Sequence, residues 1–415
     1  MTVEWKDKNS AKIIIEEIEK LRTIDESGKV RFQGLIFYTL KTLIYNFLNF
    51  SQEISEVDAR FIVNKGIFNT GSTGEITLDN LIKEMNELEK NFLSIPKQRY
   101  VLVTSISINQ TVNMRRINID NNRIVIERTL HKRFHTSERN DLINLASKSI
   151  IGNLPTDYSY VRIFGTSRSV YGAANQAIDI LNFFRGIWNY SVNRSFSFRR
   201  TFGGKPSPIN RIVLGPIHTL HNYDGSLAVK NQWWYDPGYY GPIKPYFPNE
   251  KDFSTLMKAQ QYMRKRISNL NYSKDIVSGI VRYCKALDER DMTSSFLKLW
   301  GVLEFLTSTT RTSYDVTIKR TASIYQKRDF HLQVLKVIRD YRNSYVHSDE
   351  ETEEVETYLI QLKNYVESLI HFHLTNGHNF FSLSDSADFF DLPVYEKDLL
   401  KKLKLLKYAV KFRHY

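Results

Sequence analysis

The chain has 415 residues, of which 42% are hydrophobic and 25% charged, the balance of an ordinary folded protein. This length exceeds one ordinary core, so we expect two or three domains. Lysine and arginine outnumber aspartate and glutamate by 58 to 45, and the resulting charge of +13 favours a polyanionic partner without identifying it. A basic protein with no such partner is the alternative. The single cysteine, Cys284, excludes an internal disulfide framework and a zinc site built on several thiolates.

The first 95 residues carry three apolar stripes at helical spacing and predict helices joined by loops, with one loop over 69–74. Runs rich in β-branched residues at 100–108 and 112–128 then predict strands, and a turn over 120–122 divides the second run into two strands. A further strand is expected over 158–164.

Helical spacing returns over 173–190, and the proline-rich and aromatic stretch 191–250 predicts strands and ordered loops that join two domains. From about residue 252 the pattern is helical to about residue 376. We therefore expect an α+β region over 1–250 with a sensory or regulatory role, followed by an all-α bundle over 251–378.

The last segment, 379–415, is predicted to hold an acidic loop and a basic C-terminal helix. The loop contains Asp385, Asp388 and Asp391, and the helix alternates lysines with leucines. That pattern suits a helix on a membrane surface, a helix contacting RNA, or a terminal helix that packs its leucines on the body. We expect the last of these.

The pattern with most chemical content is Arg342-Asn343 followed by His347. Arginine binds phosphate oxygens through paired hydrogen bonds, and histidine transfers protons near neutral pH. Asn343 could hold a ribose hydroxyl or a phosphate oxygen. The motif ends a predicted helix over 331–345, and Ser348 with Glu351 forms a capping box that predicts the start of the next helix.

Arg342 and His347 are about 140° apart around a regular helix, so they do not share one face. Two copies of the chain meeting about a two-fold axis could complete each other's site. We therefore expect a homodimer or a higher homo-oligomer.

The Arg-Asn-x3-His motif between two helices resembles the HEPN superfamily of nucleic-acid-associated helical domains. The upstream run Leu-Trp-x-x-Leu-Glu-x-Leu over 299–306 is similar to the ApeA-like branch, which is linked to bacterial anti-phage defence. The resemblance covers about residues 255–375. Many members place glycine near or after the histidine, where this chain has Ser348, a position outside the reacting set.

The resemblance implies a HEPN-like bundle that works as a metal-independent endoribonuclease on cellular RNA, with transfer RNA as one candidate substrate. His347 would act as general base or general acid, Arg342 would stabilise charge on the phosphate, and Asn343 would position the substrate. A 2′-hydroxyl nucleophile restricts cleavage to RNA. The expected partners are therefore RNA and a phage-derived trigger.

Burying the Glu304 carboxylate in an apolar helix costs free energy unless the group is paired, so we expect it to hold Arg342 in position. The alternative is a half-exposed glutamate without this role. Two basic segments could contact nucleic acid, or could be ordinary exposed cations: Arg199, Arg200 and Lys205 in the first, and Arg264, Lys265 and Arg266 in the second. His131 and His135 have zinc-like spacing but no third ligand nearby, and the cations between them oppose a metal, so the run 131–135 predicts a basic surface patch.

We expect no cofactor, no metal and no membrane partner. The polar start of the chain and the lack of an apolar run of about 18 residues predict a cytoplasmic protein. Two alternatives to the enzyme remain. One is a catalytically silent HEPN-like module that binds nucleic acid or a partner, and the other is a protein whose helical end serves only assembly.

Overall fold

The computed structural model describes residues 3–109, 115–119, 122–149, 154–193, 207–235, 239, 241–310, 312–348 and 354–413. Within these ranges an α+β region is followed by a helical region, as the sequence predicts. No described helix is both long and apolar enough to cross a bilayer.

The N-terminal residues form a small helical domain with its own core. Its helices are α1 (Lys8–Lys20), α2 (Ile36–Asn46), α3 (Glu56–Thr73) and α4 (Leu78–Ser94). Two short antiparallel ribbons flank them, formed by β1 (Glu4–Trp5) with β4 (Leu48–Asn49) and β2 (Arg22–Ile24) with β3 (Val30–Phe32). The predicted apolar stripes make the core, which buries Ile18, Ile44, Ile67, Leu81 and Met85.

The loop predicted over 69–74 is wrong, because α3 continues through Thr73. The glycine in this turn permits close packing of the helix. A Cβ on Gly71 would lie 3.2 Å from Cδ of Arg22 and 3.3 Å from Cδ1 of Ile76. A small residue therefore marks a packed helix face here and not a loop.

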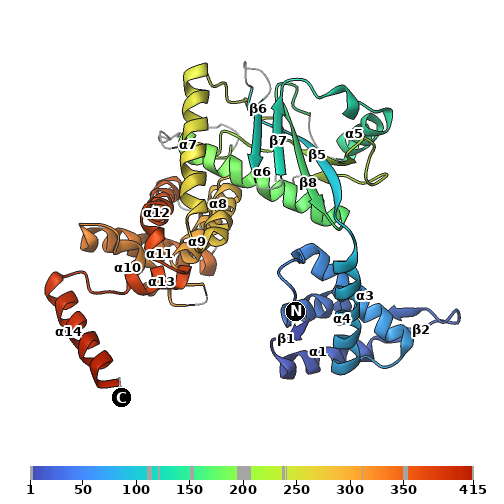
Figure 1. Ribbon diagram of the computed structural model, residues 1–415, viewed down its shortest axis with the longest axis horizontal. Coiled ribbons are helices and arrows are strands. Elements are labelled where there is room, and N and C mark those ends of the chain that lie inside the picture. Colours follow the sequence, from blue (N-terminus) through green and yellow to red (C-terminus); the bar gives the residue numbers. More distant parts are fainter. Residues whose placement is uncertain are drawn as a thin grey trace.

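Among the described residues, six strands form one antiparallel sheet in the order β10-β9-β5-β8-β7-β6. They are β5 (Gln98–Ile106), β6 (Arg115–Ile119), β7 (Asn122–Glu127), β8 (Ser159–Ser167), β9 (Ile217–Asn222) and β10 (Trp234–Tyr235). The strands predicted from β-branched runs are confirmed where the structure describes them, and most of the turn predicted over 120–122 lies outside the described residues. Helix α6 (Val170–Val192) crosses one face (Figure 1), where Leu102, Ile124 and Ile163 are buried.

The opposite face of the sheet, here called the outer face, carries a smaller cluster of Val101, Val103, Val125 and Phe164. The 3-10 turn η1 (Lys132–Phe134) inserts Phe134 into this cluster, and α5 (Ser137–Ser149) follows it beside β9. This local segment thus covers part of the outer face.

The helical region packs directly onto α6. It contains α7 (Glu250–Ser268), α8 (Ser273–Leu287), α9 (Met292–Leu306), α10 (Tyr314–Ala322), α11 (Arg328–Ser348), α12 (Val355–Asn376), η3 (Gly377–Asn379) and α13 (Leu383–Phe390). One continuous apolar cluster runs from the sheet through α6 into α8, α9 and α12. Residues 3–93 thus have a core of their own, and buried residues on both sides of residue 250, such as Trp188 and Ile280, belong to one cluster.

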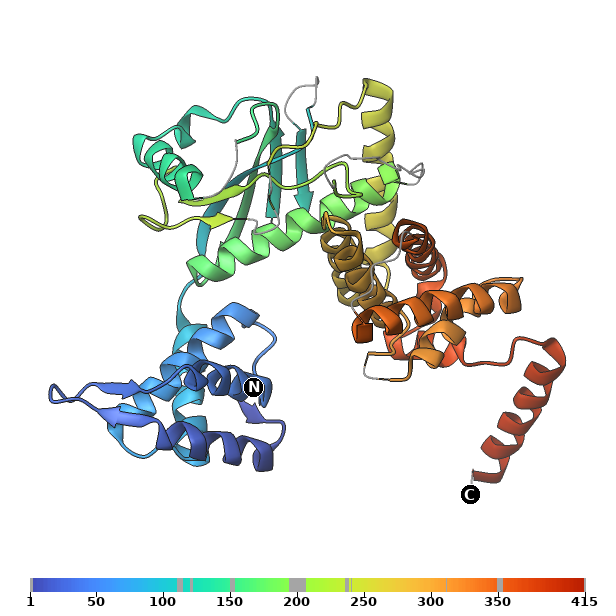
Figure 2. The same cartoon turned by 180° about the vertical axis from the view of Figure 1, so that it is seen from behind.

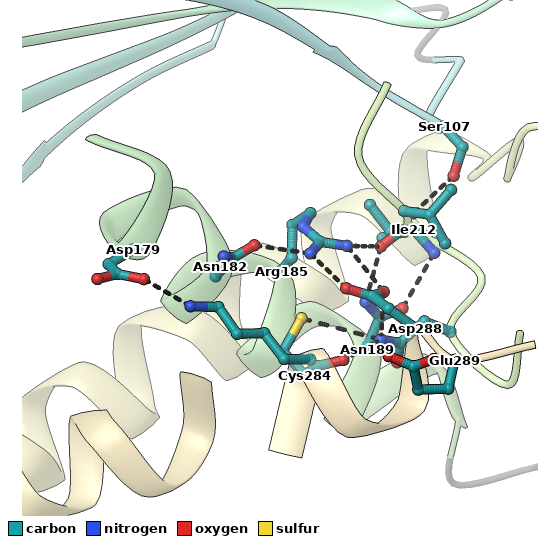
Figure 3. Close-up of polar contacts among 12 residues, drawn as sticks. Ser107, Asp179, Asn182, Arg185, Asn189, Ile212, Cys284, Asp288 and Glu289 are labelled. Carbon is teal, nitrogen blue, oxygen red and sulfur yellow. Dashed lines mark hydrogen bonds and ion pairs between the residues drawn. The ribbon is translucent and has the colours of Figure 1, made fainter. Parts of the chain in front are cut away.

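A buried polar network joins α6 to α8 across that boundary (Figure 3). Arg185 is fully buried and donates to both carboxylate oxygens of Asp288, at 3.0 and 2.7 Å, and to the Ile212 carbonyl at 3.0 Å. Asn189 also binds the backbone of Ile212, and Asn210 donates to Asp288 at 2.8 Å. Cys284 is buried beside this network, and burial raises the pKa of its thiol to about 12.

The C-terminal segment departs from the sequence prediction in two ways. The acidic stretch is largely helical, because α13 buries Ala387 and Phe390 and Asp391 pairs with Arg320 at 2.6 Å. Helix α14 (Glu396–Arg413) buries no residue and projects away from the body in both views (Figures 1 and 2). The expectation that its leucines pack on the body is therefore wrong.

Candidate active site around Arg342

Buried aromatic packing fixes the rotation of α11 beside the motif. Leu335 and Ile338 are fully buried, and Tyr341 is buried next to Arg342. The Tyr341 ring meets Phe296 of α9 edge-on and lies against Tyr358 of α12, each with centroids 5.0 Å apart. Because Tyr341 points into this core, its neighbour Arg342 is directed toward α10.

Arg342 lies on an aromatic shelf formed by α9 and α10. Its guanidinium carbon is 4.3 Å from the centre of the Tyr314 ring, a cation–π contact. The Tyr314 ring meets Trp300 edge-on at 5.9 Å, and the Trp300 indole donates to Glu304 Oε1 at 3.1 Å. We call Trp300, Glu304, Tyr314 and Arg342 the Arg342 cluster.

The guanidinium group of Arg342 forms no ion pair with the carboxylates described around it. Burial raises the pKa of Glu304, while the Trp300 hydrogen bond and the positive charge of Arg342 act in the opposite direction. No ion pair between Glu304 and Arg342 is found among the described side chains, so Glu304 interacts with Arg342 through its charge alone. Arg342 Nε is shielded from solvent and has no hydrogen-bond partner within the described ranges.

Arg339, one turn before Arg342, shows the contrast. Its guanidinium pairs with Asp315 at the start of α10 and with the adjacent Asp340 at 2.7 Å. The Asp315 carboxylate thus binds Arg339 to α10. Arg342 is instead held by the Tyr314 ring, which forms no hydrogen bond with the N–H groups of the guanidinium. Arg342 therefore keeps donors that an anionic ligand could use.

The rest of the motif lies on the same helix. Asn343 is half-buried and follows Arg342 directly. His347 lies in the last turn of α11, and its side chain is outside the described residues. The predicted capping box at Ser348 is wrong, because Ser348 belongs to α11 and α12 begins at Val355. Helix α11 contains no glycine or proline that would end it before Ser348.

The predicted basic segment over 264–266 lies apart from this cluster, on another helix. Arg264, Lys265 and Arg266 lie on α7, which packs on α6, α8 and α12. Arg264 lies 5.9 Å from the Phe184 ring and Arg266 lies 5.4 Å from the Tyr262 ring. The prediction for Arg199, Arg200 and Lys205 falls outside the described residues.

The described part of the chain holds no group of three or more histidine, cysteine, aspartate and glutamate side chains that could bind a metal ion. The two histidines with zinc-like spacing make local bonds instead. His131 Nδ1 accepts from the Arg133 amide at 3.3 Å, and His135 Nε2 lies 2.9 Å from the Leu130 carbonyl oxygen.

Two features of the structure were not predicted from the sequence. Tyr314 forms the shelf under Arg342, and its only local signal is Ser313, which caps α10 by accepting from the Asp315 amide. A polar groove of about 600 Å³ lies along the second half of α12 and contains no residue of the Arg342 cluster. It is lined by Tyr190, Tyr325, Asn364, Glu367, Ser368 and His371 among others. Its Glu367 is already bound by Lys363 at 2.8 Å and by the Tyr283 hydroxyl.

Comparisons of the sequence with family models and with curated proteins, and of the structure with solved structures, found no match.

Proposed function

We propose that the protein is a metal-independent endoribonuclease of the HEPN type, with Arg342, Asn343 and His347 as its reacting set. The main observation that supports the proposal is the position of the Arg342 side chain. Its guanidinium rests on the Tyr314 ring, no carboxylate in the described region pairs with it, and its Nε is without a partner. Such a group suits a phosphate whose negative charge grows during the reaction.

In the proposed reaction the ribose 2′-hydroxyl attacks the adjacent phosphorus atom. A bond from O2′ to phosphorus forms and the bond from phosphorus to O5′ breaks, leaving a 2′,3′-cyclic phosphate and a 5′-hydroxyl. His347 takes the proton of the 2′-hydroxyl or gives one to the leaving O5′, and Arg342 binds the phosphate oxygens. Asn343 positions the sugar. Glu304 acts through Trp300 and through its charge near Arg342.

We further propose that two copies of the chain build the site. Helix α11 is continuous from Arg342 to His347, so the two residues are separated by about 140° around its axis. A second α11 related by a two-fold axis would bring His347 of one copy to Arg342 of the other. Light scattering should then give at least twice the chain mass of 48.8 kDa. A strictly monomeric chain that still cleaves RNA would overturn this part.

In biological terms we propose an effector of anti-phage defence that cleaves cellular RNA after a phage-derived trigger, with the N-terminal part of the chain as its regulator. This part of the proposal comes from the resemblance of the motif to the ApeA-like branch. A catalytically silent module that only binds nucleic acid or a partner is the competing outcome.

The test is to incubate the purified full chain with total RNA in EDTA and to analyse the ends of the products. The proposal expects cleavage without a divalent ion, 2′,3′-cyclic phosphate ends, and loss of cleavage in His347→Ala. Cleavage that strictly requires a divalent ion would exclude the mechanism. RNA binding without any cleavage, under conditions that include phage lysate as a source of trigger, would favour the silent module.

A further inference from the structure

The outer face of the sheet brings together arginines that lie far apart in the sequence. Along each strand, side chains alternate between the two faces. Tyr100 and Ile124 face α6, so their neighbours Arg99 on β5 and Arg123 on β7 belong to the outer face. Arg123 is the cross-strand partner of Phe164, which lies on the same face.

These arginines surround two aromatic rings. The Arg123 guanidinium carbon lies 4.1 Å from the centre of the Phe164 ring. Arg99 and Arg133 lie 5.8 and 5.3 Å from the Tyr223 ring. The two rings themselves meet edge-on at 6.1 Å. We call Arg99, Arg123, Arg133, Phe164 and Tyr223 the Arg-aromatic patch.

The patch keeps its positive charge. Glu127 on this face is taken by Arg162, with an N–O distance of 2.6 Å. Among the described residues no ion pair is found for Arg99, Arg123 or Arg133. The Nε atoms of Arg123 and Arg133 are shielded from solvent and have no hydrogen-bond partner within the same ranges.

One further acid lies near the patch. Asp224 interacts electrostatically with Arg133, but its carboxylate accepts from the amide and the hydroxyl of Ser226 at 2.9 and 2.7 Å. These hydrogen bonds lower the pKa of Asp224 first, and the charge of Arg133 adds to them. The Asp224 carboxylate thus stabilises the turn that contains it, and its charge offsets that of Arg133 while Arg99 and Arg123 keep theirs.

A rigid turn presents Tyr223. The Asn222 amide donates to the Ser226 carbonyl at 2.9 Å, and the buried His221 Nδ1 lies 2.9 Å from the Gly225 carbonyl oxygen. Gly225 has a φ of +104°, and a Cβ there would lie 2.4 Å from both Cγ and the carbonyl oxygen of Arg133. Only glycine allows the turn to press against Arg133 in this way. The ring of Tyr223 remains 44% exposed.

We propose that the Arg-aromatic patch binds single-stranded nucleic acid. The guanidinium groups would bind successive phosphates, and the exposed Tyr223 ring would stack on an unpaired base. A duplex hides its base faces, so it cannot use the ring. The patch is formed by β5, β7, β8, η1 and the turn after β9, none of which contributes to the Arg342 cluster. The inference is therefore independent of the proposed ribonuclease activity.

Fluorescence anisotropy tests this binding on the full chain carrying Arg342→Ala, so that cleavage does not enter the result. The probes are a labelled single-stranded RNA of mixed sequence, the same strand in a duplex, and AMP as a competitor. We expect the single strand to bind better than the duplex and AMP to compete poorly. Tyr223→Ala should weaken single-strand binding by about fivefold or more, since stacking on one aromatic ring contributes at that level.

Two matched variants serve as controls. Tyr235→Ala removes another exposed tyrosine of the same sheet, at 56% exposure, and should leave binding unchanged. Arg99→Ala should weaken binding and reduce its salt dependence by about one counterion, whereas Arg31→Ala, which breaks an exposed pair with Asp25, should not. Circular dichroism must show that each variant folds.

Three results would overturn the proposal. They are equal binding of single strand and duplex, wild-type affinity in folded Tyr223→Ala and Arg99→Ala, and competition by AMP at concentrations equal to those of the strand. The last would assign the patch to a mononucleotide. A failure of the ribonuclease proposal would leave all of these measurements intact, because no step in them requires cleavage.

Discussion

The guanidinium carbon of Arg342 lies 4.3 Å from the centre of the Tyr314 ring, and this contact joins the motif helix α11 to α10. The ring supports the cation without consuming its hydrogen-bond donors. Arg339, on the same helix, is instead tied to carboxylates. The difference between these two arginines is the structural basis for assigning a phosphate-binding role to Arg342.

Replacing the ring should therefore affect cleavage through Arg342. Tyr314→Ala removes the cation–π contact, and we expect the cleavage rate to fall by roughly 2- to 30-fold, which corresponds to about 0.5–2 kcal/mol. Tyr314→Phe keeps the ring and should retain nearly the wild-type rate. Single-turnover cleavage assays measure both. If Tyr314→Phe were as impaired as Tyr314→Ala, the hydroxyl and not the ring face would be the important group.

Glu304 should make the protein less stable as the pH rises. Burial raises the pKa of its carboxyl, so the folded state disfavours the charged form. The associated stability is present at low pH, where the group is neutral in both states, and is lost as the pH rises through the raised pKa. Glu304→Gln should remove this loss. Melting temperatures of the two proteins at pH 4 and pH 7 measure the difference, and parallel pH profiles would contradict the prediction.

Two buried histidines should make the fold sensitive to acid. Burial lowers the pKa of His218 and of His373 from 6.5 to about 4, and the charge of Arg185 adds to the effect at His218. Each then contributes about 3 kcal/mol of stability above pH 6.5, which is lost as the pH falls toward 4. Urea unfolding should show this loss between pH 7 and pH 4.5.

His373→Gln offers a control for the acid effect. His373 Nε2 donates to the Leu306 carbonyl at 3.0 Å and its Nδ1 lies 3.0 Å from the Tyr272 hydroxyl, so the variant should be less stable at pH 7. Its stability should nevertheless fall less steeply with acid than that of the wild type. An unchanged slope would show that the pKa of His373 is the same in the folded and unfolded states.

Removal of α14 should leave the stability of the body unchanged, because the helix buries no residue. Truncation after residue 395 should shift the melting temperature by no more than about 1 °C, since no apolar surface is lost from the core. Phe390→Ala, in the neighbouring α13, is the matched contrast. It removes a buried side chain and should cost about 3–5 kcal/mol of unfolding free energy. A large loss of stability on truncation would show that α14 docks on the body.

Periodicity predicted most of the regular structure. The helical stripes before residue 95, the strands β5 to β8 and the helix α6 all follow patterns that depend on local burial. The errors come from contacts that a local pattern does not encode. Gly71 resembles a loop residue but lies in a close-packed helix face, and the leucines of α14 form an apolar pattern with no surface to receive it.

The candidate sites also depend on tertiary contacts that a local sequence pattern does not encode. The motif at Arg342 could be found by its residue types, but the Tyr314 ring beneath it could not, because α10 and α11 meet only in the folded chain. The sequence predicts a basic surface only around Arg133, and the other members of the Arg-aromatic patch were not predicted. Its members are joined by strand register, with Arg123 opposite Phe164, and by the turn that carries Tyr223.

The most direct test of the central claim compares cleavage by Arg342→Ala with cleavage by Arg339→Ala. Both variants remove an arginine from α11, and circular dichroism can verify that both fold. The proposed function predicts that Arg342→Ala loses cleavage by about 100-fold or more, whereas Arg339→Ala, which loses surface ion pairs of small energetic value, stays within a few-fold of the wild type. Wild-type cleavage by a folded Arg342→Ala protein would contradict the account.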